Sequence, residues 1–176
     1  MWAWVPVFLL SSFQRTGRGE SAASLAAFCV IGAGALGSLA AGRMADSIGR
    51  TTVTIISLAT SGTCALTAGL LYGRNPLLLV GLCLIWGFAV VADSAQFSAS
   101  VSELSEKEYL GTALTVQTSL GFLLTLLTIR LIPSVEAHIG WRWAFTVLAI
   151  GPAAGIWAMA ALRRSPAARR LASGHG

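Results

Sequence analysis

Asp93 is the only charged side chain within a long apolar stretch, residues 76–102. An acid placed in hydrocarbon is costly and usually faces a cavity or a partner group. Counted in steps of three or four along a helix, Trp86, Gln96 and Ser100 fall near the same face. This face could line a water-filled pathway, or it could form a hydrogen-bond network between helices.

A second polar face is expected in the next apolar stretch, residues 109–131. Thr115 and Ser119 lie four residues apart, and Gln117 lies nearby. Residues four apart share a helix face, so these side chains could face the same pathway as Asp93.

A polar pattern, G-x-x-x-D-x-x-G-R, separates two other apolar stretches at residues 42–50. Gly42 and Gly49 permit a tight turn and a close approach to neighbouring helices. Asp46 could cap a helix N-terminus, and Arg50 could pair with a carboxylate. The alternative is an ordinary polar turn with an arginine that reaches the membrane surface.

The sequence carries no recognisable catalytic or metal-binding motif. No histidine lies in an apolar stretch, so a serine within the membrane would have no neighbouring base. Cys29, Cys64 and Cys83 have no metal-like spacing and are expected to be small hydrophobic residues. No P-loop, dinucleotide or zinc motif is present. We therefore expect no enzyme, no cofactor and no metal.

The composition indicates that lipid, not water, surrounds most of the chain. Charged residues make up 11% of the sequence and hydrophobic residues 55%, whereas soluble proteins carry about 25% charge. The net charge of +5 does not indicate nucleic-acid binding, because the basic residues lie in the gaps between apolar stretches.

Five apolar stretches are long enough to cross a bilayer, which takes about 20 residues. A sixth stretch, residues 1–14, gives only about 21 Å of helix. It is expected to be part of a truncated helix or, alternatively, a short segment at the membrane interface. Short gaps make consecutive helices antiparallel neighbours. The predicted spans are 1–14 (partial), 21–42, 51–73, 76–102, 109–131 and 143–162.

The sequence thus predicts an all-α membrane protein, a six-helix transmembrane bundle over residues 1–164 with a disordered tail over 165–176. Small residues recur every four positions, as in Gly34, Ser38 and Gly42, and would let helix backbones approach closely. The side that holds residues 43–50 and the tail carries seven Lys and Arg residues, against four or five on the other. This bias predicts a cytoplasmic C-terminus in the cell inner membrane.

The pattern at residues 42–50 resembles the loop signature of the major facilitator superfamily, a family of twelve-helix secondary transporters. In that family the signature follows the second helix of each six-helix half, and here it follows the second predicted span. Residues 92–98 and 111–114 are similar to the tenth and eleventh helices of bacterial members. Ser47, Thr51 and Thr52 depart from the family, which often has basic residues there. The resemblance implies the C-terminal half of a bacterial member.

The resemblance implies secondary active transport of a small solute by alternating access between two six-helix halves. The implied partners are the lipid bilayer, a small-molecule solute and the N-terminal half. Transport could also be coupled to a proton, and Asp93 could carry it. The implied role of the loop is to stabilise one conformation and to release it during transport. The alternative function, a non-transporting membrane scaffold that binds partner helices, does not account for the loop signature.

Overall fold

The computed structural model describes residues 1–174, which are almost entirely helical and contain no strand. Five segments are long and apolar enough to cross a membrane: α2, α3, α4, α5 and the stretch Trp141–Arg163. The prediction of an all-α membrane protein is confirmed. The elements are α1 (Val5–Arg15), α2 (Glu20–Ile48), α3 (Arg50–Leu71), α4 (Pro76–Leu104), α5 (Leu110–Ile139), α6 (Trp141–Ala144), the 3-10 helix η1 (Thr146–Ala149), α7 (Ile150–Arg163) and the 3-10 helix η2 (Pro166–Gly174).

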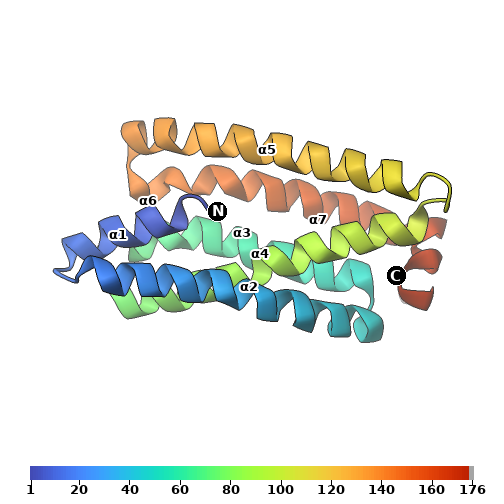
Figure 1. The fold of residues 1–176 in the computed structure, drawn as a ribbon, viewed down its shortest axis with the longest axis horizontal. Helices are drawn as coiled ribbons and strands as arrows, with labels where there is room; N and C mark the ends of the chain where they lie inside the picture. The colour runs from blue at the N-terminus through green and yellow to red at the C-terminus, as the bar shows by residue number, and fades with distance from the viewer. Residues whose placement is uncertain (175–176) are drawn as a thin grey trace.

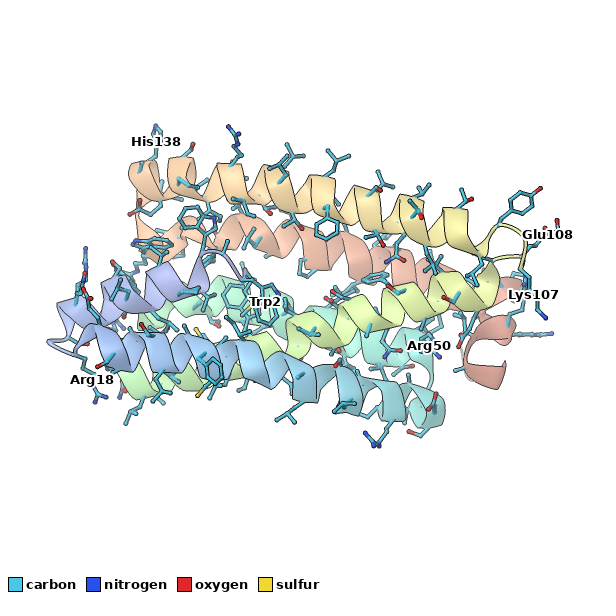
Figure 2. The ribbon with its side chains drawn as sticks, viewed as in Figure 1. Trp2, Arg18, Arg50, Lys107, Glu108 and His138 are labelled. Carbon is cyan, nitrogen blue, oxygen red and sulfur yellow. The ribbon has the colours of Figure 1, made fainter. Side chains whose placement is uncertain are left out.

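The long helices lie side by side along one axis and alternate in direction, as their short connections require (Figure 1). One end of the bundle holds the α2–α3 junction, the α4–α5 turn and η2, and we call it the Arg50 end. The other holds the α3–α4 and α5–α6 junctions, and we call it the Trp141 end. Arg50, Lys107 and Glu108 lie at the first end, and Arg18 and His138 at the second (Figure 2).

Helix α1 packs inside the bundle near the Trp141 end. Its Phe8 and Leu9 are fully buried. The Phe8 ring lies against the rings of Tyr72, Trp141 and Phe145, with centroids 5.2, 5.7 and 5.0 Å away. One face of α1 is therefore buried against the rest of the bundle.

The predicted loop over residues 43–50 is largely helical, because α2 continues to Ile48 and only Gly49 interrupts the chain. The segment contains no proline and offers helix formers such as Met44 and Ala45, so the helix continues to the first residue that breaks it. The gap predicted after residue 42 was therefore wrong, and the actual turn is a single residue.

Helix α5 extends past the predicted end at residue 131, through Pro133 to Ile139. A proline inside a helix has no N–H for the carbonyl four residues earlier, here that of Ile129. The indole Nε1 of Trp4 donates a hydrogen bond to this carbonyl oxygen at 3.2 Å. A side chain from the start of the chain thus satisfies the group that the proline leaves free.

The last predicted span, 143–162, is not one continuous helix. It divides into α6, η1 and α7, and Pro152 lies in the first turn of α7. Proline is tolerated in a first turn, but it cannot bond the carbonyl of Leu148 four residues earlier. The regular α-helix is therefore interrupted at η1, just before the turn of α7 that contains Pro152.

The disordered tail predicted for residues 165–176 was wrong for Pro166–Gly174, which form η2. Its Leu171 is fully buried, and Ala168 is nearly so. The segment η2 lies mainly against α4. The basic composition of the tail gave no sign of this contact. Residues 175 and 176 of the predicted tail lie outside the described residues.

Helices α2 and α4 meet backbone to backbone near the middle of the bundle. A methyl group on Gly37 would overlap the carbonyl of Phe88, and one on Gly87 would overlap the carbonyl of Val30. Of the glycines for which small-residue spacing predicted a close approach, Gly34 is confirmed, because a methyl group there would overlap the side chain of Val91 on α4. Gly42 has open space beside it in the described part of the chain.

The Gly37→Ala substitution should destabilise the protein, because the added methyl group must push the two backbones apart. Overpacking of this kind costs about 1–3 kcal/mol. We expect a lower midpoint of thermal unfolding in detergent, followed by size-exclusion chromatography. Gly42→Ala is the matched control and should leave the midpoint unchanged; an equal loss in both variants would contradict the close packing.

Candidate functional site

The turn at Gly49 determines where Arg50 lies. Gly49 has a φ of +94°, a conformation that other residues rarely adopt, and its N–H bonds to the carbonyl of Ala45 at 3.1 Å. Helix α3 starts at the next residue. Arg50 is therefore held in the first turn of α3, and only 8% of its surface is exposed.

All three guanidinium nitrogens of Arg50 donate hydrogen bonds to α4. Nε bonds to Glu103 Oε2 at 3.0 Å, Nη2 bonds to Glu103 Oε1, and Nη1 bonds to Gln96 Oε1 at 2.7 Å. Two parallel bonds between a guanidinium and a carboxylate form the strongest common ion-pair geometry. The expected pairing of Arg50 with a carboxylate is thus found, and it ties α3 to α4.

The Glu103 carboxylate also binds the C-terminal segment. Its Oε2 accepts a hydrogen bond from the backbone N–H of Ala172 at 2.9 Å. One carboxylate therefore connects α3, α4 and η2. We call Arg50, Gln96, Glu103 and the Ala172 N–H the Arg50 network.

Asp46 does not cap a helix N-terminus. Helices α2 and α3 meet at Gly49, so Asp46 lies in the last turn of α2, at the wrong end for capping. It is exposed and makes no hydrogen bond or ion pair with any residue of the described range 1–174. The capping hypothesis was wrong because the expected loop is too short to start a new helix at Asp46.

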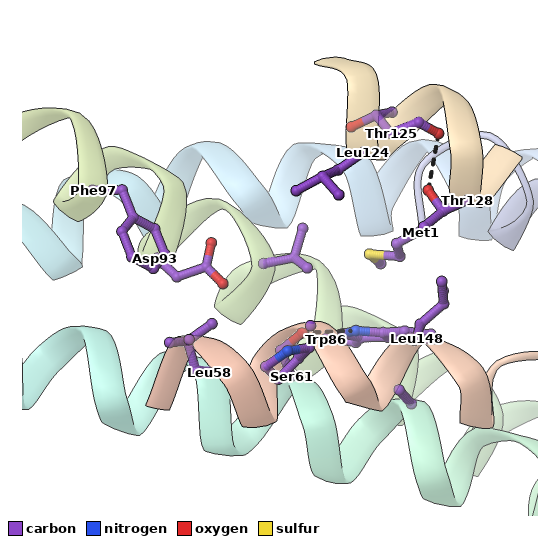
Figure 3. Close-up of a pocket in the computed structure, with 15 residues that line it drawn as sticks. Met1, Leu58, Ser61, Trp86, Asp93, Phe97, Leu124, Thr125, Thr128 and Leu148 are labelled. Carbon is purple, nitrogen blue, oxygen red and sulfur yellow. Dashed lines mark hydrogen bonds between the residues drawn. The ribbon is translucent and has the colours of Figure 1, made fainter. Parts of the chain in front are cut away.

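Asp93 lies beside a cavity of about 360 Å³ between α3, α4, α5 and α7. Figure 3 shows its carboxylate directed into this space, next to the ring of Phe97. Asp93 is 9% exposed, and its Oδ1 accepts a hydrogen bond from the Ser94 hydroxyl at 3.0 Å. Within residues 1–174, no cationic side chain lies within ion-pair distance of it.

Trp86 is the second predicted residue that lines the cavity. Its indole Nε1 donates to the Ser61 hydroxyl of α3 at 3.1 Å, and its ring meets Phe145 edge-on. These contacts fix the ring orientation, so one aromatic wall of the cavity is preorganised.

The other predicted pathway residues lie elsewhere. Gln96 belongs to the Arg50 network, and the Ser100 hydroxyl donates to the Gln96 backbone carbonyl at 2.8 Å. Gln117 Nε2 donates to the Ser98 hydroxyl at 3.2 Å and so links α5 to α4. Thr115 and Ser119 are exposed and do not line this cavity. On the polar face of α4, Trp86 and Asp93 thus line a cavity, whereas Gln96 takes part in a hydrogen-bond network. The sequence had left these two roles open as alternatives.

Several site residues were not found from the sequence. Glu103 had a usable signal, because it lies seven residues after Gln96 and so on the same helix face. Ser61, Thr125 and Thr128, the hydroxyl-bearing residues of the cavity, had none, since their position depends on how α3 and α5 are rotated. No group of three or more His, Cys, Asp or Glu side chains in the described residues could hold a metal ion.

The five long apolar helical segments define a multi-pass helical membrane protein. The family model of the Major Facilitator Superfamily matches residues 1–176. The chain belongs to the major facilitator superfamily, whose members are transporters and not enzymes. Searches of curated proteins and of solved structures found no match.

The Glu103→Gln substitution should destabilise the protein, because it leaves the buried Arg50 charge without its carboxylate. Losing a hydrogen bond to a charged group costs about 1.5–3 kcal/mol. We expect a lower thermal unfolding midpoint, and Glu106→Gln, at an exposed acid nearby, should not change it. If both variants melt like the wild type, the ion pair does not stabilise the fold.

Docking of η2 predicts that trypsin cuts slowly at Arg169 and Arg170. Leu171→Ala removes a fully buried side chain, at a cost of about 2–5 kcal/mol if the site cannot collapse. Cleavage in this variant should therefore be faster, as measured by mass spectrometry over a time course. Ala167→Ser, at a less buried position of the same segment, is the control; rapid cleavage in the wild type would contradict docking.

Proposed function

We propose that this chain is the C-terminal six-helix half of a secondary transporter that moves a small solute by alternating access. The observation that carries the proposal is the buried Asp93 carboxylate facing a cavity whose α5 wall is almost uncovered. Of the 30 residues of α5, only Ile132 is buried. A second bundle packed on α5 would close the cavity and leave the solute between two halves.

The polar side chains of α5 support the need for a second bundle. Thr115, Thr118 and Ser119 are exposed in a helix long enough to span a membrane. Polar groups facing hydrocarbon are unfavourable, and they usually face a protein partner or a water-filled cavity. The proposed partner is the N-terminal six-helix half, and the proposed orientation puts the Arg50 end in the cytoplasm of a cell with an inner membrane.

The Arg50 network fits the role of a contact that stabilises one conformation. It joins three segments at one end of the bundle through a single carboxylate. Separating Glu103 from Arg50 would free α4 and η2 to move relative to α3. In the proposed cycle this contact forms in one state and breaks in the other, while Asp93 binds the solute or a coupling proton.

A membrane scaffold without transport activity remains the second candidate. It accounts for the close helix packing at Gly37 and Gly87. It gives no reason for a buried acid without a cationic partner in the described residues, which is costly unless a ligand binds there.

Cysteine labelling tests alternating access directly. Thr125 lines the cavity and its hydroxyl bonds to the carbonyl of Gly121. A Thr125→Cys variant of the complete gene product, with Cys29, Cys64, Cys83 and any cysteine of the other half replaced by alanine, should react with a membrane-impermeant thiol reagent. We expect reaction both in intact cells and in inside-out vesicles, since the cavity opens to each side in turn.

Thr63→Cys is the matched control. Thr63 is exposed on α3, does not line the cavity, and its hydroxyl bonds to Ala59 in the same manner. It should not react from both sides. Reaction of Thr125→Cys from one side only would exclude alternating access and favour the scaffold.

The DNA upstream of the Met1 codon tests the other part of the proposal. Six further apolar stretches in the same reading frame, with a second G-x-x-x-D-x-x-G-R pattern, would support the two-half architecture. A nearby in-frame stop with no gene for a partner half would contradict it.

A further inference from the structure

Two buried or half-buried carboxylates on α4 differ in how their charge is balanced. Glu103 has its cation in Arg50. Asp93, ten residues earlier, has the Ser94 hydroxyl and no cationic side chain within ion-pair distance in the range 1–174. An ionised carboxylate removed from water is costly unless a cation or a proton balances its charge. Asp93 therefore offers a site for a cation, because no cationic side chain of the described residues pairs with it.

The lining of the cavity is acidic, aromatic and otherwise apolar. Of the fifteen residues that line it, Asp93 is the only one with an ionisable side chain, and no lysine, arginine or histidine is among them. Met1 also lines the cavity, and its terminal amino group is not within ion-pair distance of Asp93. The uncharged polar groups are three hydroxyls, of Ser61, Thr125 and Thr128. This charge pattern disfavours an anionic solute and favours a cationic one.

Two aromatic rings lie on the same helix as the acid. Trp86 is held by Ser61 and Phe145, and Phe97 is one turn from Asp93 (Figure 3). Aromatic faces attract organic cations, and a ring already held in place loses little entropy when a cation binds. A carboxylate with one ring a turn away and a second ring two turns away in the same cavity suits an ammonium group attached to an apolar body.

An inorganic cation fits this lining less well. Hard metal cations require about six oxygen ligands, and most of the cavity wall is carbon. A volume of about 360 Å³ also far exceeds the size of a bare ion. The lining instead matches a small organic molecule with one positive charge.

We propose that the solute is a lipophilic organic cation, whose ammonium group pairs with Asp93 near Phe97 while its apolar body extends along the cavity toward Trp86. The proposal rests on the function proposed above, because it assigns the substrate class of the same cavity.

Equilibrium binding of radiolabelled benzyltrimethylammonium to the complete transporter in lipid nanodiscs tests the proposal. The wild type should bind this cation, and unlabelled benzylsulfonate and benzyl alcohol should not compete, since they share the aromatic body without the positive charge. Asp93→Asn should weaken binding by about tenfold or more, the usual effect of removing one partner of a desolvated charge pair. Competition by all three compounds alike, or no binding by the wild type, would overturn the proposal.

Two further variants separate charge from folding. Asp93→Glu keeps the carboxylate and should retain most of the binding. Glu106→Gln removes an exposed acid outside the cavity and should bind like the wild type. Equal affinity in Asp93→Asn and Glu106→Gln would also overturn the proposal, because the cation would then not depend on the cavity acid.

The two proposals can fail separately. Labelling of Thr125→Cys from both sides of the membrane reports alternating access without any solute. Two-sided labelling with no cation binding would leave the transporter and exclude this substrate class. Cation binding that depends on Asp93, with labelling from one side only, would establish the site and exclude alternating access.

Discussion

The ion pair between Arg50 and Glu103 is the interaction on which the Arg50 end of the bundle depends. A buried guanidinium is tolerated only when its charge is paired and its N–H groups are bonded, and here Glu103 and Gln96 meet both conditions. Arg50 opens α3 directly after the turn at Gly49, so the pair attaches the start of α3 to α4. The same carboxylate holds η2 through the Ala172 N–H, so three segments, α3, α4 and η2, depend on one pair of charges.

Helix α4 is the element that all other parts of the site share. Its central part lies backbone to backbone against α2 at Gly87, a contact that lipid-embedded helices make where small residues permit it. Its following turns carry Asp93 toward the cavity and Gln96 toward Arg50. The packing at Gly87 thus provides a fixed point from which the acid and the amide are positioned.

The sequence predicted the features that depend on local composition and missed those that depend on distant contacts. Lengths of apolar stretches identify the spans because bilayer thickness sets them. The continuation of α5 through Pro133 could not be predicted, since it depends on Trp4 at the far end of the chain. Asp93 and Gln96 lie on the same face of α4 but have different surroundings. Asp93 faces the cavity, whereas Gln96, one turn later, bonds to Arg50, and both neighbours come from other parts of the chain.

The spacing of Asp93 and Glu103 on one continuous helix has a thermodynamic consequence. Ten residues of α-helix span about 15 Å, and a helix of this length behaves as a nearly rigid rod. A tilt of α4 that separates Glu103 from Arg50 must therefore also displace Asp93 relative to α3 and α7. By linkage, any ligand that binds Asp93 more tightly in one tilt changes the strength of the distant ion pair by the same free energy, and the ion pair changes the affinity of the ligand in return.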